Sequence, residues 1–333
     1  MSAPSSATLP EAVRALAEAD FGAVAQRFRD AGFAVALPAS GILTVKAAVA
    51  DPARASVLVS VGVHGDETGP IEMVAHLVEA LSQSPAALAV DLMLCVGNID
   101  AIRLGKRFVD ADLNRMFRAQ RGALAGTFEA GRADVLIAAT RAFFEGSGAA
   151  RWHLDLHTAI RPSHYPMFAI VPELIADAAR ERLIAWLGEA GIQAIIMSPE
   201  SAGTYSYFTS EHLGAAGSTV ELGKVGVLGQ NDLSQFAAAS SALERLLRGQ
   251  PAQPAREAPH VFDTAQSIIK LSDAFTMSVG RETWNFTALK KGDVIASDGD
   301  TVYTVKHDQE LVVFPNPDVR VGLRAGIMVV RTR

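Results

Sequence analysis

The stretch VGVHGDETGP, residues 61–70, places a histidine and a glutamate three positions apart in a glycine-rich turn. Imidazole nitrogens and carboxylate oxygens are zinc ligands, and two histidines with one glutamate form a known catalytic set with an open fourth position. His64 and Glu67 supply two of these ligands, and the glycines allow the backbone to turn both toward one ion. Taken alone, the pair also fits a hydrogen-bonded turn without a metal. A metal site therefore requires a third ligand from elsewhere.

A second group of candidate ligands lies in RWHLDLHT, residues 151–158. Strict alternation predicts a strand with His153, Asp155 and His157 on one face. The two histidines would be ~13 Å apart, too far to share one ion. His157 stands at the predicted strand end beside the loop TAIRPSHYP, so it is the better third ligand, and His153 is interpreted as a hydrogen-bonded interior residue. Asp155 fits either a carboxylate that orients a ligand histidine or a structural carboxylate.

Four further histidines have no partner at ligand spacing. We interpret them as structural or surface residues: His76, His164, His212 and His260.

The loop GKRFVDADLNRMF, residues 105–117, gathers polar groups that could bind an anion. An arginine fork matches a carboxylate with two hydrogen bonds, and a neighbouring amide can donate a third. Arg107, Asn114 and Arg115 are the candidates. The alternative is a loop braced by its own pairs, such as Asp112 with Arg115.

A further carboxylate closes a predicted strand in STVELGKVGVLGQND, residues 218–232. At a strand end in a cleft, Glu221 could take a proton from water and pass it to a leaving amine. The alternative is an exposed loop glutamate.

The elements that must position these residues alternate along the chain, which indicates an α/β sheet covered by helices on both faces. Thr8 is predicted to cap a first helix, with Glu11 reaching back. Strands are expected near residues 55–63, 89–97, 151–157, 166–171, 192–197 and 217–222. Helices are expected from about Pro70 and near residues 131–145, 173–190 and 231–248.

The pattern changes at GQPAQPAREAP, which has three prolines in eleven residues and reads as a boundary. We therefore expect an α/β domain over residues 1–250 and a small all-β domain over 258–333.

Composition excludes several classes of function. The net charge of −6 and the pI of about 5.8 argue against nucleic acid as a partner. The single cysteine, Cys95, lies in an apolar run and is expected to be a buried core residue; it fits a reducing compartment. The first residues do not resemble a signal peptide, and nowhere do 18 apolar residues run together. The sequence thus predicts a cytoplasmic protein without a membrane partner, and leaves homo-oligomerisation open.

Four motifs in the same order resemble the succinylglutamate desuccinylase/aspartoacylase family, a branch of the zinc carboxypeptidase-like fold. They are GVHGDETGPIE, DADLNRMF, DLHTAIRPSHYP and ELGKVGVLGQNDLSQF. The resemblance covers most of the chain, including the β-rich end. HTAIR and GQNDL are more similar to the succinylglutamate desuccinylases than to the aspartoacylases.

The resemblance implies a role for each candidate residue. One zinc ion per chain would be held by His64, Glu67 and His157. Glu221 would act as general base and then acid, and Arg107 would stabilise the oxyanion. Asn114 and Arg115 would hold one substrate carboxylate, and Arg161, in HTAIR, another.

The activity implied is hydrolysis of N-succinyl-L-glutamate to succinate and L-glutamate. Such a substrate carries three carboxylates, so an acidic protein must concentrate arginines at its site, as loops 105–117 and 157–163 do. The alternatives are another acylamino-acid deacylase such as an aspartoacylase, a zinc carboxypeptidase, or a binding protein that has lost catalysis.

The resemblance also bears on the β-rich end. We expect it to pack over the mouth of the site and limit substrate size, with some residue beyond 258 within ~10 Å of Arg107, Arg161 or Glu221. A solvent-side domain with no contact to the cleft is the alternative.

Overall fold

The computed structural model describes residues 9–148 and 150–333. Thr8, the predicted helix cap, lies outside them; the helix itself begins at Glu11. The strands of the N-terminal part are β1 (Ala34–Ala39), β2 (Ile42–Lys46), β3 (Ser56–Val61), β4 (Asp91–Val96), β5 (Arg151–Ala159), β6 (Met167–Pro172), β7 (Ala194–Ser198) and β8 (Ala216–Lys224). The α-helices are α1 (Glu11–Ala17), α2 (Gly22–Asp30), α3 (Thr68–Gln83), α4 (Ile99–Leu104), α5 (Phe128–Phe144), α6 (Asp177–Glu189), α7 (Tyr205–Leu213) and α8 (Ala237–Leu247).

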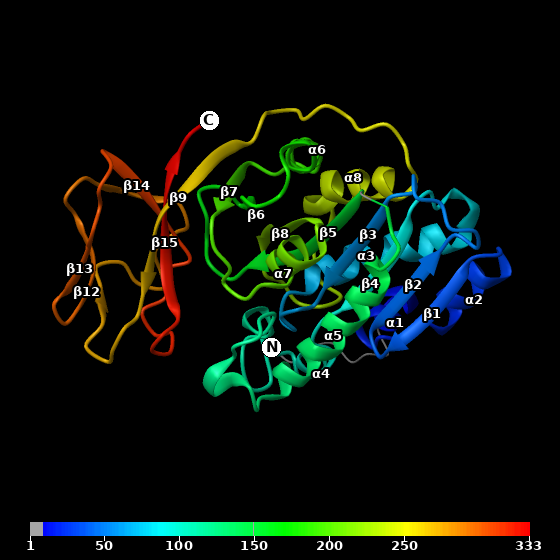
Figure 1. Ribbon diagram of the computed structural model, residues 1–333, viewed down its shortest axis with the longest axis horizontal. Coiled ribbons are helices and arrows are strands. Elements are labelled where there is room, and N and C mark those ends of the chain that lie inside the picture. Colours follow the sequence, from blue (N-terminus) through cyan, green and yellow to red (C-terminus); the bar gives the residue numbers. More distant parts are fainter. Residues whose placement is uncertain (1–8, 149) are drawn as a thin grey trace.

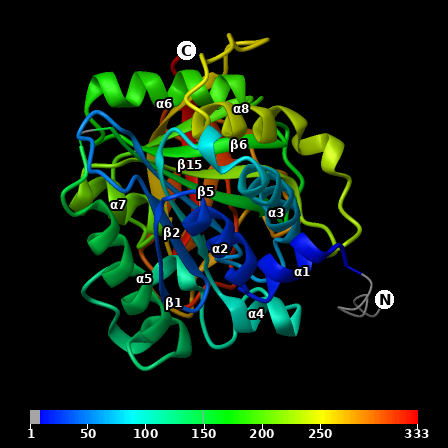
Figure 2. The ribbon, with the colours of Figure 1, turned by 90° about the vertical axis from the view of Figure 1, so that its right-hand side faces the viewer.

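The predicted α/β sheet with helices on both faces is confirmed, and the sheet is mixed, as expected for the zinc carboxypeptidase-like fold that the motifs resemble (Figure 1). Alternate residues of each central strand face opposite layers, so Val57 and Val59 join the core under α1, α2, α3, α6 and α8, whereas Leu58 joins the core under α5 and α7. Figure 2 shows the sheet between these two helix layers. Cys95 is fully buried in the second core, as expected.

The sequence did not reveal α2, α4, α7 or the antiparallel pair β1 and β2. The helix expected from residue 231 begins at Ala237, because the Asp232 side chain accepts a hydrogen bond from the Ser234 amide and holds a short 3₁₀ turn first. The other predicted strands and helices are present, with ends that differ by a few residues.

The C-terminal part is all β. Its strands are β9 (His260–Ile269), β10 (Thr276–Met277), β11 (Thr287–Lys290), β12 (Val294–Asp298), β13 (Thr301–Thr304), β14 (Gln309–Val313) and β15 (Arg324–Arg331). It has its own apolar core, around Ile268, Ile295 and Val312.

The two parts share one sheet, which the sequence did not predict. The strand order is β1-β2-β4-β3-β5-β8-β6-β7-β9-β15-β14-β11, and β10, β12 and β13 form a second sheet. Strand β9 pairs in parallel with β7, from Ala194 opposite His260 to Met197 opposite Asp263, and antiparallel with β15. Apolar residues of both parts also form a shared cluster, including Phe168, Phe262 and Phe286.

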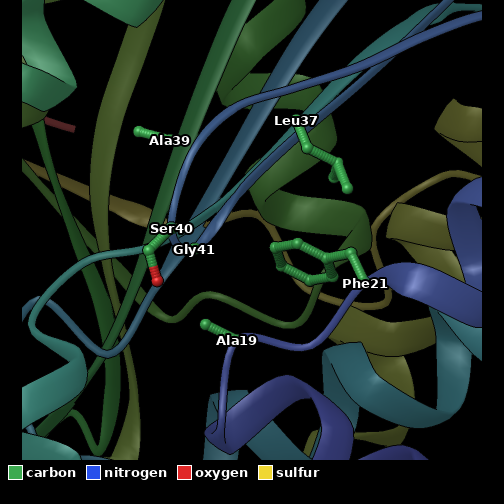
Figure 3. A pocket seen from close by; sticks show the side chains of 6 residues that line it. All are labelled: Ala19, Phe21, Leu37, Ala39, Ser40 and Gly41. Atoms are coloured by element: carbon green, nitrogen blue, oxygen red, sulfur yellow. The ribbon is translucent and has the colours of Figure 1, made fainter.

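The fold has two further features. Among the described residues, no helix has the length and apolar character needed to cross a membrane. A pocket where the turn between α1 and α2 meets the β1–β2 hairpin has no ionisable side chain among its lining residues, Ala19, Phe21, Leu37, Ala39, Ser40 and Gly41 (Figure 3).

Candidate metal centre and active site

The turn of residues 62–67 joins β3 to α3 and owes its shape to two glycines. Gly62 has φ +63°, in the left-handed region that favours glycine. At Gly65 a Cβ atom would lie 2.3 Å from the carbonyl carbon of Ala101, so no other residue fits without displacing the backbone. The Gly65 amide donates to the carbonyl of Arg107 at 3.0 Å. The glycines therefore press this turn against the loop that carries Arg107.

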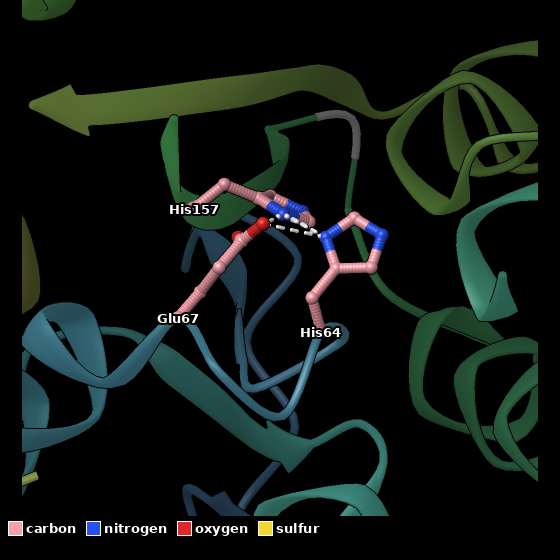
Figure 4. Close-up of side chains that lie close together, drawn as sticks. All are labelled: His64, Glu67 and His157. Carbon is pink, nitrogen blue, oxygen red and sulfur yellow. Dashed lines mark hydrogen bonds and ion pairs between the residues drawn. The ribbon is translucent and has the colours of Figure 1, made fainter. Parts of the chain in front are cut away.

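The turn points two buried side chains at a third from β5 (Figure 4). His64 Nδ1 lies 2.8 Å from Glu67 Oε1, and His157 Nδ1 lies 2.8 Å from Glu67 Oε2. The two Nδ1 atoms are 3.3 Å apart. All three potential donor atoms lie within 4.8 Å of one another.

A carboxylate holds the far nitrogen of each histidine. His64 Nε2 is 2.9 Å from Asp112 Oδ1, and His157 Nε2 is 2.9 Å from Asp155 Oδ2. Histidines that bind metals usually donate their other nitrogen to such a partner, which fixes the ring orientation. The structure thus gives Asp112 and Asp155 an orienting position, and the donor set fits a metal ion.

Opposing effects act on the ionisation of the three candidate ligands. Burial would raise the pKa of Glu67, but His64 and His157 lower it well below its usual value. Burial would lower the pKa of His157, but Asp155 and Glu67 raise it well above the usual value. The three side chains therefore stabilise one another electrostatically: the histidines favour the ionised form of Glu67, and the carboxylates favour the protonated forms of the histidines.

His153 lies outside this group, as the strand geometry predicted. Its Nε2 is 2.8 Å from Ser60 Oγ, and its Nδ1 is 2.8 Å from Thr209 Oγ1. Burial lowers the pKa of His153 to about 4, so the ring is neutral at pH 7. Ser60 also donates to Asp155 at 2.5 Å, which ties this network to the partner of His157.

Glu221 is neither at a strand end nor exposed. It lies inside β8, directly opposite His157 in the register with β5, and β8 continues to Lys224. The strand continues because β5 and β6 pair with it on both sides, so it ends two residues beyond the expected residue 222. Its Oε2 is buried without a hydrogen-bond partner among the described residues. Burial, with the nearby Glu67 carboxylate, raises the pKa of Glu221 to about 7.

Arg107 reaches the same centre. Its Nη1 donates to Glu67 Oε1 at 2.7 Å, and about a third of its side chain remains exposed. The exposed part of Arg107 can therefore also contact a ligand bound next to Glu67.

The Asn114–Arg115 pair sits in a short 3₁₀ turn beside the centre. Asn114 is buried, and its Oδ1 accepts the Tyr205 amide at 2.8 Å, at the start of α7. Arg115 donates from Nη1 to the Asn114 carbonyl and lies 3.9 Å from Asp112 Oδ2. Asp112 is engaged more closely by His64 than by Arg115, so the loop is not simply braced by this pair.

Arg161 lies at the contact with the C-terminal part. Its Nε donates to the Arg281 carbonyl at 3.1 Å. The adjoining loop is held by Asn285, whose amide donates to the Pro162 carbonyl and whose carbonyl accepts the His164 amide. The C-terminal part therefore lies well within the ~10 Å of Arg161 that we expected.

Comparison with known proteins agrees with these motifs. The family model described as Succinylglutamate desuccinylase/Aspartoacylase catalytic domain matches residues 53–247, and the AstE/AspA barrel-sandwich hybrid domain matches residues 257–332. The chain belongs to the succinylglutamate desuccinylase/aspartoacylase family. The resemblance inferred from the sequence is thereby confirmed.

Individual relatives agree with this membership. The chain is 47% identical, over 88% of its length and 86% of the relative, to a succinylglutamate desuccinylase of Burkholderia orbicola (strain MC0-3). The crystal structure of succinylglutamate desuccinylase from Vibrio cholerae has a TM-score of 0.84 at 31% identity, covering 91% of this chain and 88% of that one. That from Chromobacterium violaceum has a TM-score of 0.77 at 34% identity, covering 93% and 98%.

The sequence did not identify some residues that surround the centre and orient the groups next to it. It named Asp112 only as a brace for the loop, although its place in a polar loop was a usable signal. Nothing local marked Ser60 or Thr209, because each is a single hydroxyl that meets His153 only in the folded sheet.

Proposed function

We propose that the protein hydrolyses the amide of N-succinyl-L-glutamate to succinate and L-glutamate, with one zinc ion per chain held by His64, Glu67 and His157. One observation carries the proposal: a buried His–Glu–His donor set lies beside a buried carboxylate that has no hydrogen-bond partner among the described residues. The Burkholderia and Vibrio relatives, named succinylglutamate desuccinylases, support the choice of substrate.

The metal ion and Glu221 have separate roles in the proposed reaction. When bound, zinc would supply Lewis acidity, which activates water at neutral pH and polarises the scissile carbonyl. Glu221 accepts the proton of the attacking water and returns it to the leaving nitrogen of glutamate. A pKa near 7 suits both steps, because the group then gains and loses a proton with little cost at neutral pH.

The cationic and amide groups position the substrate. Arg107 faces the developing negative charge on the carbonyl oxygen, since its exposed part lies next to Glu67. Asn114 and Arg115 bind the α-carboxylate of glutamate, and Arg161 meets a second carboxylate. The C-terminal domain covers part of the site and excludes larger substrates. The cytoplasmic location predicted from the sequence belongs to the same proposal.

The proposal is tested by elemental analysis of the purified protein with a substrate panel. N-succinylglutamate, N-acetylaspartate and a peptide with a free C-terminus are compared under one condition, and release of the amino acid is measured. We expect about one zinc per chain and a clear preference for N-succinylglutamate. Faster release from N-acetylaspartate or from the peptide would overturn the substrate assignment but leave the metal assignment standing.

A further inference from the structure

Two arginines from different domains converge on the loop of residues 199–204. On one side, this loop packs on Arg115: the Phe117 amide donates to the Gly203 carbonyl at 3.1 Å, and a Cβ on Gly203 would lie 2.7 Å from the Arg115 carbonyl oxygen. On the other side, Glu200 accepts a hydrogen bond from Ser267 of β9 at 2.6 Å. Arg324 begins β15 and pairs with Ile269, two residues beyond Ser267.

The charge of Arg324 is poorly neutralised. The residue is half-buried, yet its guanidinium has no hydrogen bond or ion pair with any residue that the structure describes. Burial, together with the charge of Arg115, lowers the pKa of Arg324 to about 10, and Glu200 offsets only part of this change. Asp112, the carboxylate that pairs with Arg115 at 3.9 Å, already holds His64, so it does not fully neutralise the positive charge on this side of the loop.

A second pair of arginines spans the same interface, but there one of the two positive charges is neutralised by a carboxylate. Arg161 and Arg281 also repel each other, since Arg281 contributes to the lowered pKa of Arg161. Arg281, however, pairs with Asp318 at 2.7 Å. Of the two arginines that the C-terminal domain brings to the interface, Arg324 is thus the one whose charge is left for a ligand.

We propose that Arg324 binds the γ-carboxylate of the glutamate half of the substrate, next to Arg115, and so helps to determine specificity. This rests on the proposed function, in which Arg115 holds the α-carboxylate. The γ-carboxylate belongs to the same amino acid and lies farther from the scissile amide. An arginine of the outer domain at the start of β15, next to the loop that packs on Arg115, matches that position.

The test compares N-succinylglutamate with N-succinylglutamine, which replaces the γ-carboxylate by an amide of nearly the same shape. Arg324→Gln should lower kcat/KM for N-succinylglutamate roughly 10- to 100-fold, the range for a lost hydrogen bond to a charged group. With N-succinylglutamine the variant should stay within a few-fold of wild type. Arg324→Lys keeps the charge and should recover part of the loss.

Two comparisons control the measurement. Arg331 is an exposed arginine at the other end of β15. Arg331→Gln should leave kcat/KM unchanged for both substrates. An analogue with the succinyl carboxylate replaced by an amide should still respond to Arg324→Gln as N-succinylglutamate does.

The outcomes separate this inference from the proposed function. Equal losses on N-succinylglutamate and N-succinylglutamine, or a loss that disappears only with the succinyl amide, would overturn the assignment of Arg324. A wild-type protein that does not cleave N-succinylglutamate would overturn the proposed function, and this inference with it. If Arg324→Gln does not fold, Arg324→Lys decides by the same comparison of substrates.

Discussion

At the level of single side chains, the candidate metal centre is built from one short turn and one distant histidine, and each of its two histidines has a carboxylate partner on its far nitrogen. Asp112 orients His64, and Asp155 orients His157, so both rings present Nδ1 to the same point. This arrangement predicts which substitutions remove the metal and which do not.

His64→Ala and His157→Ala are expected to lose most of the bound zinc, because each removes one of three donors that share a centre. His153→Ala should keep it, since that ring bonds only to Ser60 and Thr209. Elemental analysis of the purified variants measures this. Loss of metal from His153→Ala together with retention in His157→Ala would mean that the wrong histidine was chosen.

Glu221→Gln preserves shape but cannot accept a proton. Turnover should fall by ~10²–10⁴, the range typical of a general base, with zinc content unchanged. Steady-state kinetics on metal-replete protein provide the measurement. Activity within a few-fold of wild type would remove Glu221 from the mechanism.

The same residue should make the stability of the metal-free protein depend on pH. Its pKa is raised from 4.5 to about 7 in the folded protein, so the folded state binds this proton more tightly than the unfolded chain. Protonated Glu221 therefore makes its full contribution to the free energy of unfolding below about pH 4. This contribution is lost as the pH rises through 7, a change of up to about 3 kcal/mol. Thermal unfolding in the presence of a chelator should therefore show that the stability of Glu221→Gln rises relative to that of the wild type between pH 5 and pH 8. A difference that stays constant over this range would contradict the assignment.

At the level of strands, helices and loops, the sequence predicted most of the α/β alternation because apolar residues alternate in β3, β4 and β5. It missed β1 and α2, where exposed and apolar residues are mixed. It placed His64, Glu67 and His157 in one candidate site, because their spacing is local or lies on one strand face, and the structure brings these three side chains together. It could not find Arg281 or Arg324, because only the pairing of β9 and β15 and the contacts of the loop after β5 bring them near the site.

One loop ties β8, which carries Glu221, to α3, which follows the turn of His64 and Glu67. After Glu221 the chain folds back, and Asn231 Nδ2 donates to Glu72 Oε1 of α3 and to Thr68 Oγ1. The Gly229 amide donates to the same Glu72 oxygen at 2.5 Å. The Glu72 carboxylate, which accepts these hydrogen bonds, therefore helps to fix the loop after Glu221 relative to the helix that follows Glu67.

Asn231→Asp should destabilise the protein by about 1–3 kcal/mol, because it places a second acceptor against Glu72. Urea unfolding measures the change. Gln230→Glu adds the same charge at the exposed neighbouring position and should have little effect. If both variants lost equal stability, net charge rather than this contact would be the cause.

For the protein as a whole, the two domains share a sheet and an apolar cluster. Phe168 of β6 and Phe286 of the C-terminal domain have ring centroids 5.3 Å apart, and Phe262 of β9 packs against Phe286 at the same distance. Two domains with this much common core are expected to unfold together.

Calorimetry should accordingly show one transition, with equal calorimetric and van't Hoff enthalpies. Phe262→Ala, which opens a cavity in the shared cluster, should lower the temperature of that single transition by several degrees. Two separable transitions in the wild type would show that the domains unfold independently.

The parallel pairing of β7 with β9 also covers a strand edge that could otherwise pair with another molecule. Without residues 258–333, the backbone of β7 would present unpaired amides and carbonyls along AIIMS, a segment without charge or proline. Such an edge is a template on which another chain can add a strand. A protein ended before β9 would therefore be prone to intermolecular aggregation, even if every side chain of the metal centre were intact.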